Sequence, residues 1–268
     1  MPASASPHCL VVGTGYTGRR LLAQLAPDQA TGLNRTPASN IHELDLDTGM
    51  PWPELDYLPG PLTSIVYTVP PARDAANDRR LEQLLSLLPG SPARIVYLST
   101  SGVYGDCNGA LVSETAKPAP TTERAQRRYA AEQYLQHWSA AQGVSVIILR
   151  VPGIYGPGRL GIERIRQDEP VLHLDEAHPG NRIHVDDLVS CCLAALADDV
   201  PAGIYNLGDG DNRSASWFSM EVARQAGLPP PAMITREQAN AQFSPMRLSF
   251  LNESRRLDLS KMQTLLQP

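Results

Sequence analysis

The chain has 268 residues, enough for one large domain or for a large domain with a smaller lobe. Hydrophobic residues make up 42% and charged residues 19%, as is typical of globular proteins, and the net charge is −5. No run of lysine and arginine is long enough to hold a polyanion, so nucleic acid and anionic membrane surfaces are not expected partners. The longest apolar run, near residues 188–197, is too short to span a bilayer.

The amino-terminal residues and the cysteines indicate a cytoplasmic protein. The opening MPASASPH lacks the basic start and apolar core of a secretory signal. The four cysteines show no CxxC or Cys/His spacing. This favours small buried hydrophobic residues in a reducing compartment, and we expect no metal site.

Apolar runs rich in valine and isoleucine recur through the chain and predict β-strands. They lie at residues 9–12, 64–69, 94–99 and 144–150, with a shorter run at 203–207. Their nearly continuous apolar character is typical of strands buried on both faces of a parallel sheet. Leucines at helical spacing lie between them, for example in residues 81–88. The alternation predicts an α/β fold with a Rossmann-type, doubly wound parallel sheet and a small C-terminal lobe.

A long helix and a later change of pattern suggest where the chain divides. Residues 122–141 predict one helix, with an apolar face formed by Ala131, Tyr134, Leu135 and Trp138. After Arg159, short strands and helices alternate with proline loops. We expect residues 1–160, with about 183–207, to form the main domain, and residues 161–182 and 208–268 to form the smaller lobe.

A glycine motif follows the first predicted strand. The run VVGTGYTGRRL spaces Gly13, Gly15 and Gly18 as G-x-G-x-x-G at the start of a predicted helix. In this context the motif favours a dinucleotide site over a glycine turn without a ligand. Gly13 would permit the tight turn, Gly15 would let a pyrophosphate approach the backbone, and Gly18 would let helix and strand pack closely. The first helical residues, Tyr16 and Thr17, would then lie beside the phosphates.

The residues after the second predicted strand bear on the choice between NAD and NADP. An NAD-preferring site usually carries Asp or Glu there for the ribose 2′-hydroxyl, but this chain has Asn34 and Arg35. An arginine can pair with a 2′-phosphate that a carboxylate would repel, so NADP is the expected cofactor, with NAD as the alternative. The alternative is that Arg35 lies in a solvated loop and contacts no cofactor. Asp45 is expected either to reach the adenine or to cap a loop.

Four later segments resemble the landmarks of one family. They are STSGVYG (99–105), LRVPGIYGPGR (149–159), NRIHVDDLV (181–189) and IYNLGDG (204–210). With the glycine motif, and in this order, they resemble the extended short-chain dehydrogenases/reductases, the NAD(P)-dependent epimerase/dehydratase group. The resemblance implies a Rossmann domain with a C-terminal substrate lobe and NAD(P)-linked chemistry on a small molecule, often a nucleotide sugar. It also allows a homodimer built through helix pairs.

The resemblance places a catalytic hydroxyl at Thr100, four residues before the tyrosine of the VYG run. This hydroxyl would hydrogen-bond the substrate carbonyl or hydroxyl as hydride moves, although a threonine capping a turn is the alternative. Sugar dehydratases of the family carry Asp-Glu next, but Ser101 and Gly102 follow here, so dehydration by the usual route is not expected. Pro152 and Gly153 would shape a loop that passes near the nicotinamide.

The family's Tyr-x-x-x-Lys pair has no counterpart in the long predicted helix. The register set by Glu132 and by the strand ending at Arg150 puts Arg124 at the Tyr position and Arg128 at the Lys position. Arg128 could keep the positive charge and the contact with the nicotinamide ribose. Arg124 cannot act as an acid or base, because a guanidinium stays protonated. A register slipped to Tyr129 is disfavoured, since a glutamine stands four residues later. The departure resembles an atypical branch of the superfamily.

Three residues are candidates to replace the missing proton donor. Tyr104 lies close to Thr100 in sequence, and its phenol could reach the pocket, with core packing as the alternative. Tyr155 belongs to the loop near the nicotinamide. His184 precedes a predicted helix, where a buried histidine bonded to the backbone is the more common role. An arginine that grips nucleotide-sugar phosphates in many family epimerases is replaced here by Gly180.

The sequence therefore predicts an NADP-dependent oxidoreductase or epimerase-like enzyme acting on a small hydroxy, carbonyl or sugar-derived compound. In this reading Thr100 orients the substrate and Arg128 holds the ribose. The alternative is a non-catalytic NADP(H)-binding sensor or interaction protein that kept the pocket and lost the Tyr-Lys pair.

Overall fold

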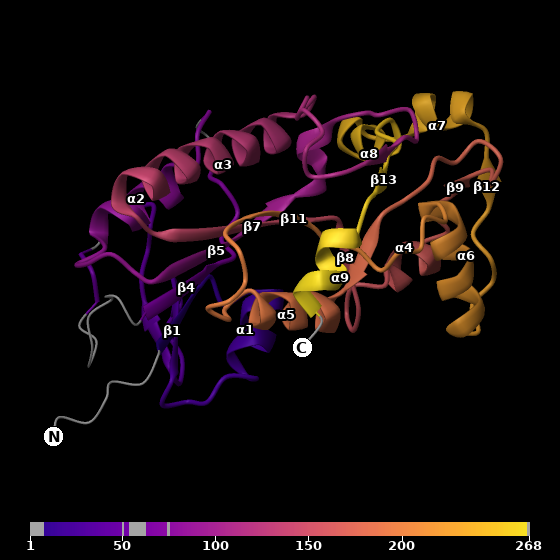
Figure 1. Cartoon of the computed structure of the whole chain (residues 1–268). Coiled ribbons are helices and arrows are strands. Elements are labelled where there is room, and N and C mark those ends of the chain that lie inside the picture. Colours follow the sequence, from indigo (N-terminus) through magenta and orange to yellow (C-terminus); the bar gives the residue numbers. More distant parts are fainter. Residues whose placement is uncertain (1–7, 50, 54–62, 74–75, 267–268) are drawn as a thin grey trace, which may run out of the picture.

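A parallel sheet forms the centre of the protein. The computed structural model describes residues 8–49, 51–53, 63–73 and 76–266. The sheet has seven strands in the order β3-β2-β1-β4-β5-β7-β11 (Figure 1). Their bounds are β1 (His8–Val12), β2 (Ala30–Asn34), β3 (Ile41–Glu43), β4 (Thr63–Tyr67), β5 (Arg94–Thr100), β7 (Ser145–Val151) and β11 (Gly203–Asn206). All neighbours pair in parallel, and the strand order reverses between β1 and β4, so the predicted Rossmann-type fold is confirmed.

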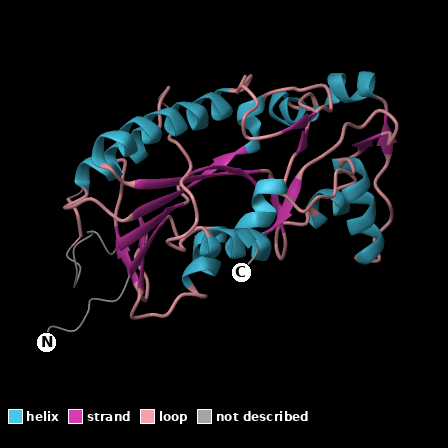
Figure 2. Ribbon diagram, in the orientation of Figure 1, coloured by secondary structure: helices cyan, strands magenta, loops and turns pink. Residues whose placement is uncertain are grey.

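Helices cover both faces of this sheet and make a three-layer arrangement (Figure 2). On one face lie α2 (Arg79–Leu87) and α3 (Glu123–Gln142), and on the other lie α1 (Tyr16–Leu22), α5 (Val185–Ala194) and α9 (Ser260–Leu266). Alternate residues of each strand enter the two cores: Val11 packs with α1 and α5, whereas Leu10 packs with α2 and α3. Because both strand faces are buried, the strands read as continuous apolar runs.

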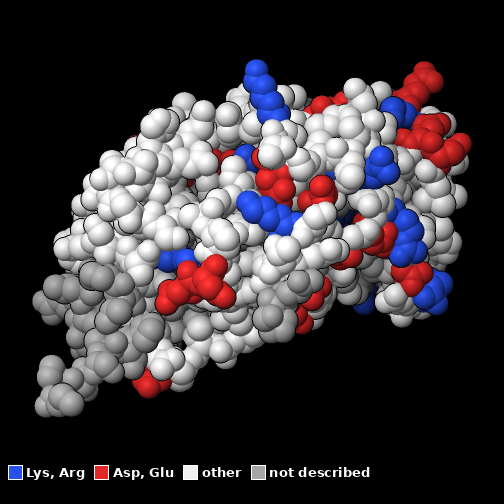
Figure 3. Space-filling view, in the orientation of Figure 1, with Lys and Arg blue, Asp and Glu red and all other residues white. Residues whose placement is uncertain are grey.

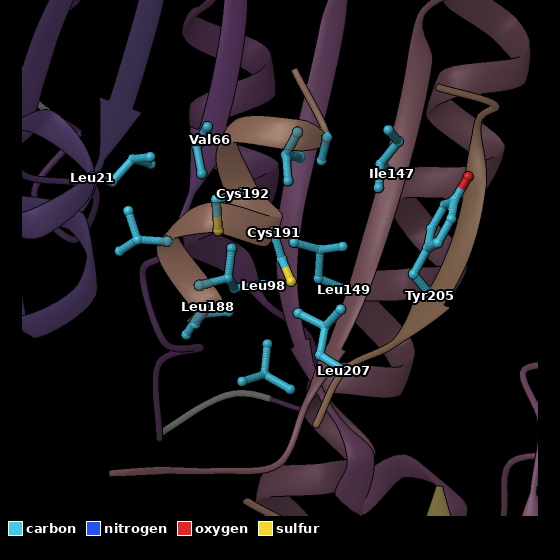
Figure 4. Packing of buried hydrophobic residues seen from close by; sticks show 14 of the residues in the cluster. Leu21, Val66, Leu98, Ile147, Leu149, Leu188, Cys191, Cys192, Tyr205 and Leu207 are labelled. Carbon is cyan, nitrogen blue, oxygen red and sulfur yellow. The ribbon is translucent and has the colours of Figure 1, made fainter. Parts of the chain in front are cut away.

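The core beside α5 contains most of the cysteines. Cys191 and Cys192 of α5 pack against Leu98 and Leu149 of the sheet (Figure 4). Cys9 is also buried in this cluster, and Cys107 is half-buried elsewhere. All four are free thiols, in agreement with their interpretation as small hydrophobic residues.

The helix α3 begins and ends where its capping residues stand. The Thr122 hydroxyl accepts a hydrogen bond from the Ala125 amide, and Gly143 ends the helix with a left-handed φ of 67°. Leu135 is buried in the core, but Tyr134 is 40% exposed, so the prediction that Tyr134 belongs to the buried face is wrong. Three residues along a helix rotate a side chain by about 60° from the starting direction, which puts Tyr134 at the edge of the apolar stripe.

The remaining elements form a smaller lobe on the right of Figure 1. Its helices are α4 (Ile162–Arg166), α6 (Ala215–Gln225), α7 (Arg236–Gln242) and α8 (Pro245–Leu251). Three short parallel pairs join β8 (Gly153–Tyr155) to β10 (Arg182–His184), β9 (Val171–Leu172) to β12 (Met233–Ile234), and β6 (Leu111–Val112) to β13 (Arg256–Leu257). The predicted lobe at 208–268 differs at its end, because Met262 and Leu265 of α9 pack into the core beside α5.

Charged residues of both signs mix on one face of the molecule (Figure 3). On the face shown in Figure 3, lysine and arginine atoms are interspersed with aspartate and glutamate atoms. None of the helices in the described ranges is both long and apolar enough to cross a bilayer.

Candidate functional site

A cleft of about 390 Å³ opens at the carboxyl edge of the sheet. Residues from the ends of six strands of the main sheet or the loops that follow them line it, together with residues of α1, α2, α3, β8 and the loop after β8. The lining consists of Val12, Gly13, Gly15, Tyr16, Thr17, Leu33, Asn34, Arg35, Leu44, Asp45, Leu46, Asp47, Thr68, Val69, Pro70, Arg80, Leu98, Ser99, Arg128, Val151, Ile154 and Arg159. Open α/β sheets bind their ligands at this edge, where the strand order reverses.

The glycine turn forms one wall of the cleft. Gly13 has a φ of 91°, and its amide donates to the carbonyl of Leu33 over 2.8 Å. A Cβ at Gly18 would lie 2.1 Å from the Gly13 carbonyl oxygen, so Gly18 packs the helix on the turn and does not line the cleft. A Cβ at Gly15 would have no atom of the described chain within 4 Å. The space beside Gly15 is therefore open to a ligand, as a pyrophosphate requires.

Arginines gather at the end of the cleft formed by β2 and β3. Asn34, Arg35 and Asp45 line this end. The Asp45 carboxylate accepts from the Asp47 amide over 2.9 Å, so Asp45 also caps the loop.

The carboxylate of Asp47 organises these arginines. Arg80 donates to it from Nε over 2.7 Å, while Arg35 and Arg79 each approach within 3.8 Å. The hydrogen bond from Arg80 lowers the pKa of Asp47, so this carboxylate is charged at neutral pH. Three guanidinium groups thus share the carboxylate of Asp47, and Arg80 holds it most closely. Sequence reasoning missed Arg80, because no local motif links it to Asp47.

Arg128 lines the opposite part of the cleft. Its Nη1 donates to the Val69 carbonyl over 3.2 Å and to the Tyr97 hydroxyl over 3.1 Å. Burial raises the pKa of Tyr97 to about 12, although the nearby Arg128 acts in the opposite direction. Tyr97 is therefore a neutral partner, and Arg128 brings a fixed positive charge to the position where a nicotinamide ribose is expected.

Thr100 stands at the end of β5, next to the cleft lining. Its Oγ1 accepts from the Gly102 amide over 3.1 Å and so caps the short helix η1 (Ser101–Tyr104). Ser99 lines the cleft, whereas Thr100 does not. Pro152 and Gly153 likewise fall between two lining residues, Val151 and Ile154, without lining the cleft themselves.

A buried ion pair fixes α3 against the sheet. Arg150 of β7 donates from Nη2 to Glu132 of α3 over 2.7 Å, and Ser99 donates to the same carboxylate. Both charged side chains are at most 2% exposed. The pair therefore joins the cleft wall at Ser99 to the helix that carries Arg128.

Arg124 lies away from the cleft lining and faces α8. Its guanidinium carbon is 3.7 Å from the centre of the Phe250 ring, and its Nη1 donates to the Ser249 hydroxyl over 3.1 Å. Burial lowers the pKa of Arg124, but a guanidinium remains protonated at ordinary pH. Arg124 therefore does not fill the cleft and cannot carry the proton.

The three candidates for the missing proton donor make their contacts outside the cleft lining. Tyr104 is 2% exposed, its hydroxyl donates to Asn206 over 2.7 Å, and burial raises its pKa. The Tyr155 ring makes edge contacts with His184 and Phe218. His184 accepts from the Asp186 amide over 3.3 Å as the cap of α5. For Tyr104, core packing is favoured over the proposed proton transfer.

Within the described ranges, no group of His, Cys, Asp or Glu side chains is arranged to hold a metal ion.

Comparisons with known proteins agree with this geometry. Residues 75–208, half of the chain, match the model of the NAD dependent epimerase/dehydratase family. Protein YeeZ of Escherichia coli K12 is 29% identical over 239 residues, covering 82% of this chain and 84% of YeeZ.

Two solved structures extend the comparison. A functionally unknown conserved protein from Silicibacter pomeroyi DSS is 29% identical, with a TM-score of 0.79 over 97% of this chain and 92% of that one. The UDP-glucuronic acid 4-epimerase of Bacillus cereus, solved with UDP-glucuronic acid and NAD, is 19% identical, with a TM-score of 0.72 over 97% and 93% of the two chains. The chain, with its parallel sheet and its cleft at the switch point, belongs to the NAD dependent epimerase/dehydratase family.

Proposed function

We propose that the chain binds NADP(H) in this cleft and acts as an oxidoreductase or epimerase-like enzyme on a small hydroxy, carbonyl or sugar-derived compound. The observation that carries the proposal is the continuity of the cleft. One cavity joins the open space beside Gly15, the arginines around Asp47, and the fixed charge of Arg128. In a dinucleotide the phosphates would lie beside Gly15, the adenine ribose beside the arginines around Asp47, and the nicotinamide ribose beside Arg128.

The charge at the β2–β3 end supports NADP over NAD. Arg35 is 67% exposed at its side chain and lies only loosely beside Asp47, so its guanidinium can turn to a 2′-phosphate. Arg80 already compensates the Asp47 carboxylate at close range. The loosely paired Arg35 guanidinium therefore favours a cofactor that carries the additional phosphate.

The residues of the chain would divide the work at the other end. A bound nicotinamide would supply or accept the hydride. Arg128 would hold the ribose. The Thr100 hydroxyl would orient the reacting oxygen of the substrate once this hydroxyl has left its hydrogen bond with the Gly102 amide. The proton would have to come from the substrate, from water, or from a side chain that does not line the cleft in this conformation.

A second candidate, a non-catalytic NADP(H) sensor, is favoured by one observation. Among the described residues that line the cleft there is no histidine, and the one tyrosine, Tyr16, already donates to the Pro157 carbonyl over 2.9 Å. Among these described residues, the carboxylates of Asp45 and Asp47 lie at the β2–β3 end, so the cleft offers a place for a dinucleotide without an evident acid or base beside Arg128.

An activity screen separates the two candidates. Protein loaded with NADPH or NADP is incubated with a panel of carbonyl and hydroxy compounds and of sugar derivatives. NADPH absorbance and substrate NMR report turnover. An enzyme should turn over a member of the panel, and Thr100→Val should lower kcat at least about 100-fold, because a positioned hydroxyl is lost. Thr100→Ser, which keeps the hydroxyl, should retain most of the activity. Binding of NADPH with no turnover across the panel would favour the sensor.

A further inference from the structure

Arg159 enters the cleft from a distant part of the chain and stacks on Tyr16, the residue that follows the glycine turn. It belongs to the loop after β8 and lines the same cavity as Gly13 and Gly15. Its guanidinium carbon lies 4.0 Å from the centre of the Tyr16 ring. Arg20 of α1 lies at the same distance from that ring, but Arg20 does not line the cleft.

The loop that carries Arg159 is fastened to the start of α1. The Tyr16 hydroxyl donates to the Pro157 carbonyl over 2.9 Å. Gly156 has a φ of 141°, and a Cβ there would lie 3.0 Å from the Tyr16 hydroxyl oxygen and 3.1 Å from Nε2 of His184. Only glycine fits this close approach. The loop therefore has little freedom to withdraw Arg159 from the glycine turn.

The charge of Arg159 differs from that of the other arginines of the cleft. Arg80 and Arg35 share the carboxylate of Asp47, and Arg128 donates to Val69 and Tyr97. For Arg159, no carboxylate within 4.0 Å and no side-chain hydrogen bond is found in the part of the chain that the structure describes. Its guanidinium is stacked, exposed and uncompensated, at the wall where the cleft has space for phosphate.

We propose that Arg159 binds the pyrophosphate of the dinucleotide. The inference rests on the proposed cofactor site and adds to it a cationic contact that the glycine motif does not require. The turn at Gly13 and Gly15 fixes where a pyrophosphate approaches the backbone. A guanidinium presents paired N–H groups that match two phosphate oxygens, and stacking on Tyr16 leaves these groups free at the edge of the plane.

Titrations with two ligands test this role. NADPH and ADP-ribose share the pyrophosphate, but ADP-ribose lacks the nicotinamide and the 2′-phosphate. Their Kd values are measured for the natural protein, for Arg159→Gln and for Arg20→Gln. The Arg159→Gln change should raise both Kd values about tenfold, because each ligand loses a charge-assisted hydrogen bond. Arg20 contacts the Tyr16 ring from outside the cleft, so Arg20→Gln should change neither Kd value by more than about twofold.

A second readout separates a charge contact from a structural effect. The difference in Kd between Arg159→Gln and the natural protein should shrink in 1 M salt, because an exposed charge is screened. Unchanged Kd values in Arg159→Gln, or a loss for NADPH alone, would overturn the proposal. If the natural protein bound neither ligand, the proposed cofactor site itself would fail, and this result is distinct from a failure confined to Arg159.

Discussion

Gly15 and Gly18 stand three residues apart in the same motif but meet different surroundings. A Cβ at position 18 would lie 2.1 Å from a backbone oxygen, and one at position 15 would meet nothing within 4 Å. Position 18 therefore serves the packing of α1, and position 15 serves the proposed ligand.

Alanine at each position should separate folding from binding. Gly18→Ala should lower the thermal midpoint, with a cost of roughly 1–3 kcal/mol or more, because the backbone must shift to admit the methyl group. Gly15→Ala should leave the midpoint nearly unchanged and weaken NADPH binding strongly, since the methyl group would stand where the phosphate approaches. Thermal unfolding and NADPH titration of both variants check this. Normal NADPH binding by Gly15→Ala would contradict the placement of the pyrophosphate.

Single residues of the site were predictable where a local motif carried them. The glycines, Asn34 and Arg35 follow strands that the apolar pattern reveals, and all except Gly18 line the cleft. Arg80 was not predictable, because it meets the cleft only after distant segments fold together. Arg159 ends a landmark that the sequence revealed, but the sequence did not reveal its contact with Tyr16. For Tyr104 the sequence offered proton transfer and core packing, and closeness to Thr100 in sequence did not distinguish them. The ring beside Arg150 and the hydrogen bond to Asn206 favour packing.

Helix α3 is joined to the sheet by the ion pair of Glu132 and Arg150. The pair is buried, and Ser99 at the cleft adds a third partner to the carboxylate. Removing one charge would leave the other buried without compensation, which is more costly than removing both. The position of Arg128 on α3 therefore depends on this pair.

Glu132→Gln should destabilise the protein by about 3–5 kcal/mol, because the Arg150 guanidinium stays buried without its counter-charge. The matched control is Glu163→Gln, which removes an exposed pair with Arg166 at 2.6 Å. The control substitution should not measurably lower the free energy of unfolding. Urea unfolding of the two variants provides the measurement, and equal stabilities would show that the buried pair contributes little.

Elements with a strong pattern were predictable and short ones were not. The strands of the main sheet and the helix at 123–142 have apolar periodicity and capping residues. The three paired strands of the lobe contain two or three residues each, too few for any periodicity to appear. Their pairing depends on contacts across the lobe.

At the scale of the whole molecule, burial keeps two thiols and one tyrosine of the core neutral. Burial raises the pKa of the Cys9 and Cys191 thiols from an ordinary value of 9.0 to about 12. Burial also raises the pKa of Tyr97, from 10.0 to about 12. The neutral forms of these groups are therefore favoured by folding.

The free energy of unfolding should consequently fall as the pH rises from about 9 toward 12. A raised pKa in the folded state means that the stability is fully present below the unfolded pKa and is lost as the pH approaches the folded value. Urea unfolding between about pH 7.5 and 11 measures the slope. Cys191→Ala, which removes one of these thiols, should flatten it, and an unchanged slope in this variant would count against the effect of burial.

Two parts of the expected division of the chain can be compared with the elements. The return of residues 203–206 to the sheet fits the expectation, because their apolar run resembles the other strands. The packing of α9 against α5 was not predicted. A helix of seven residues carries no sequence signal that tells whether it packs beside α5 or in the smaller lobe.

The most direct test of the proposed cofactor site is a calorimetric titration with NADPH and then with NADH. It is made on the natural protein, on Arg35→Gln, and on Arg79→Gln, which touches Asp47 but does not line the cleft. The proposal predicts tighter binding of NADPH than of NADH, a loss of that preference by roughly 10-fold or more in Arg35→Gln, and little change in Arg79→Gln. Binding of neither dinucleotide to the natural protein would contradict the assignment of the cleft.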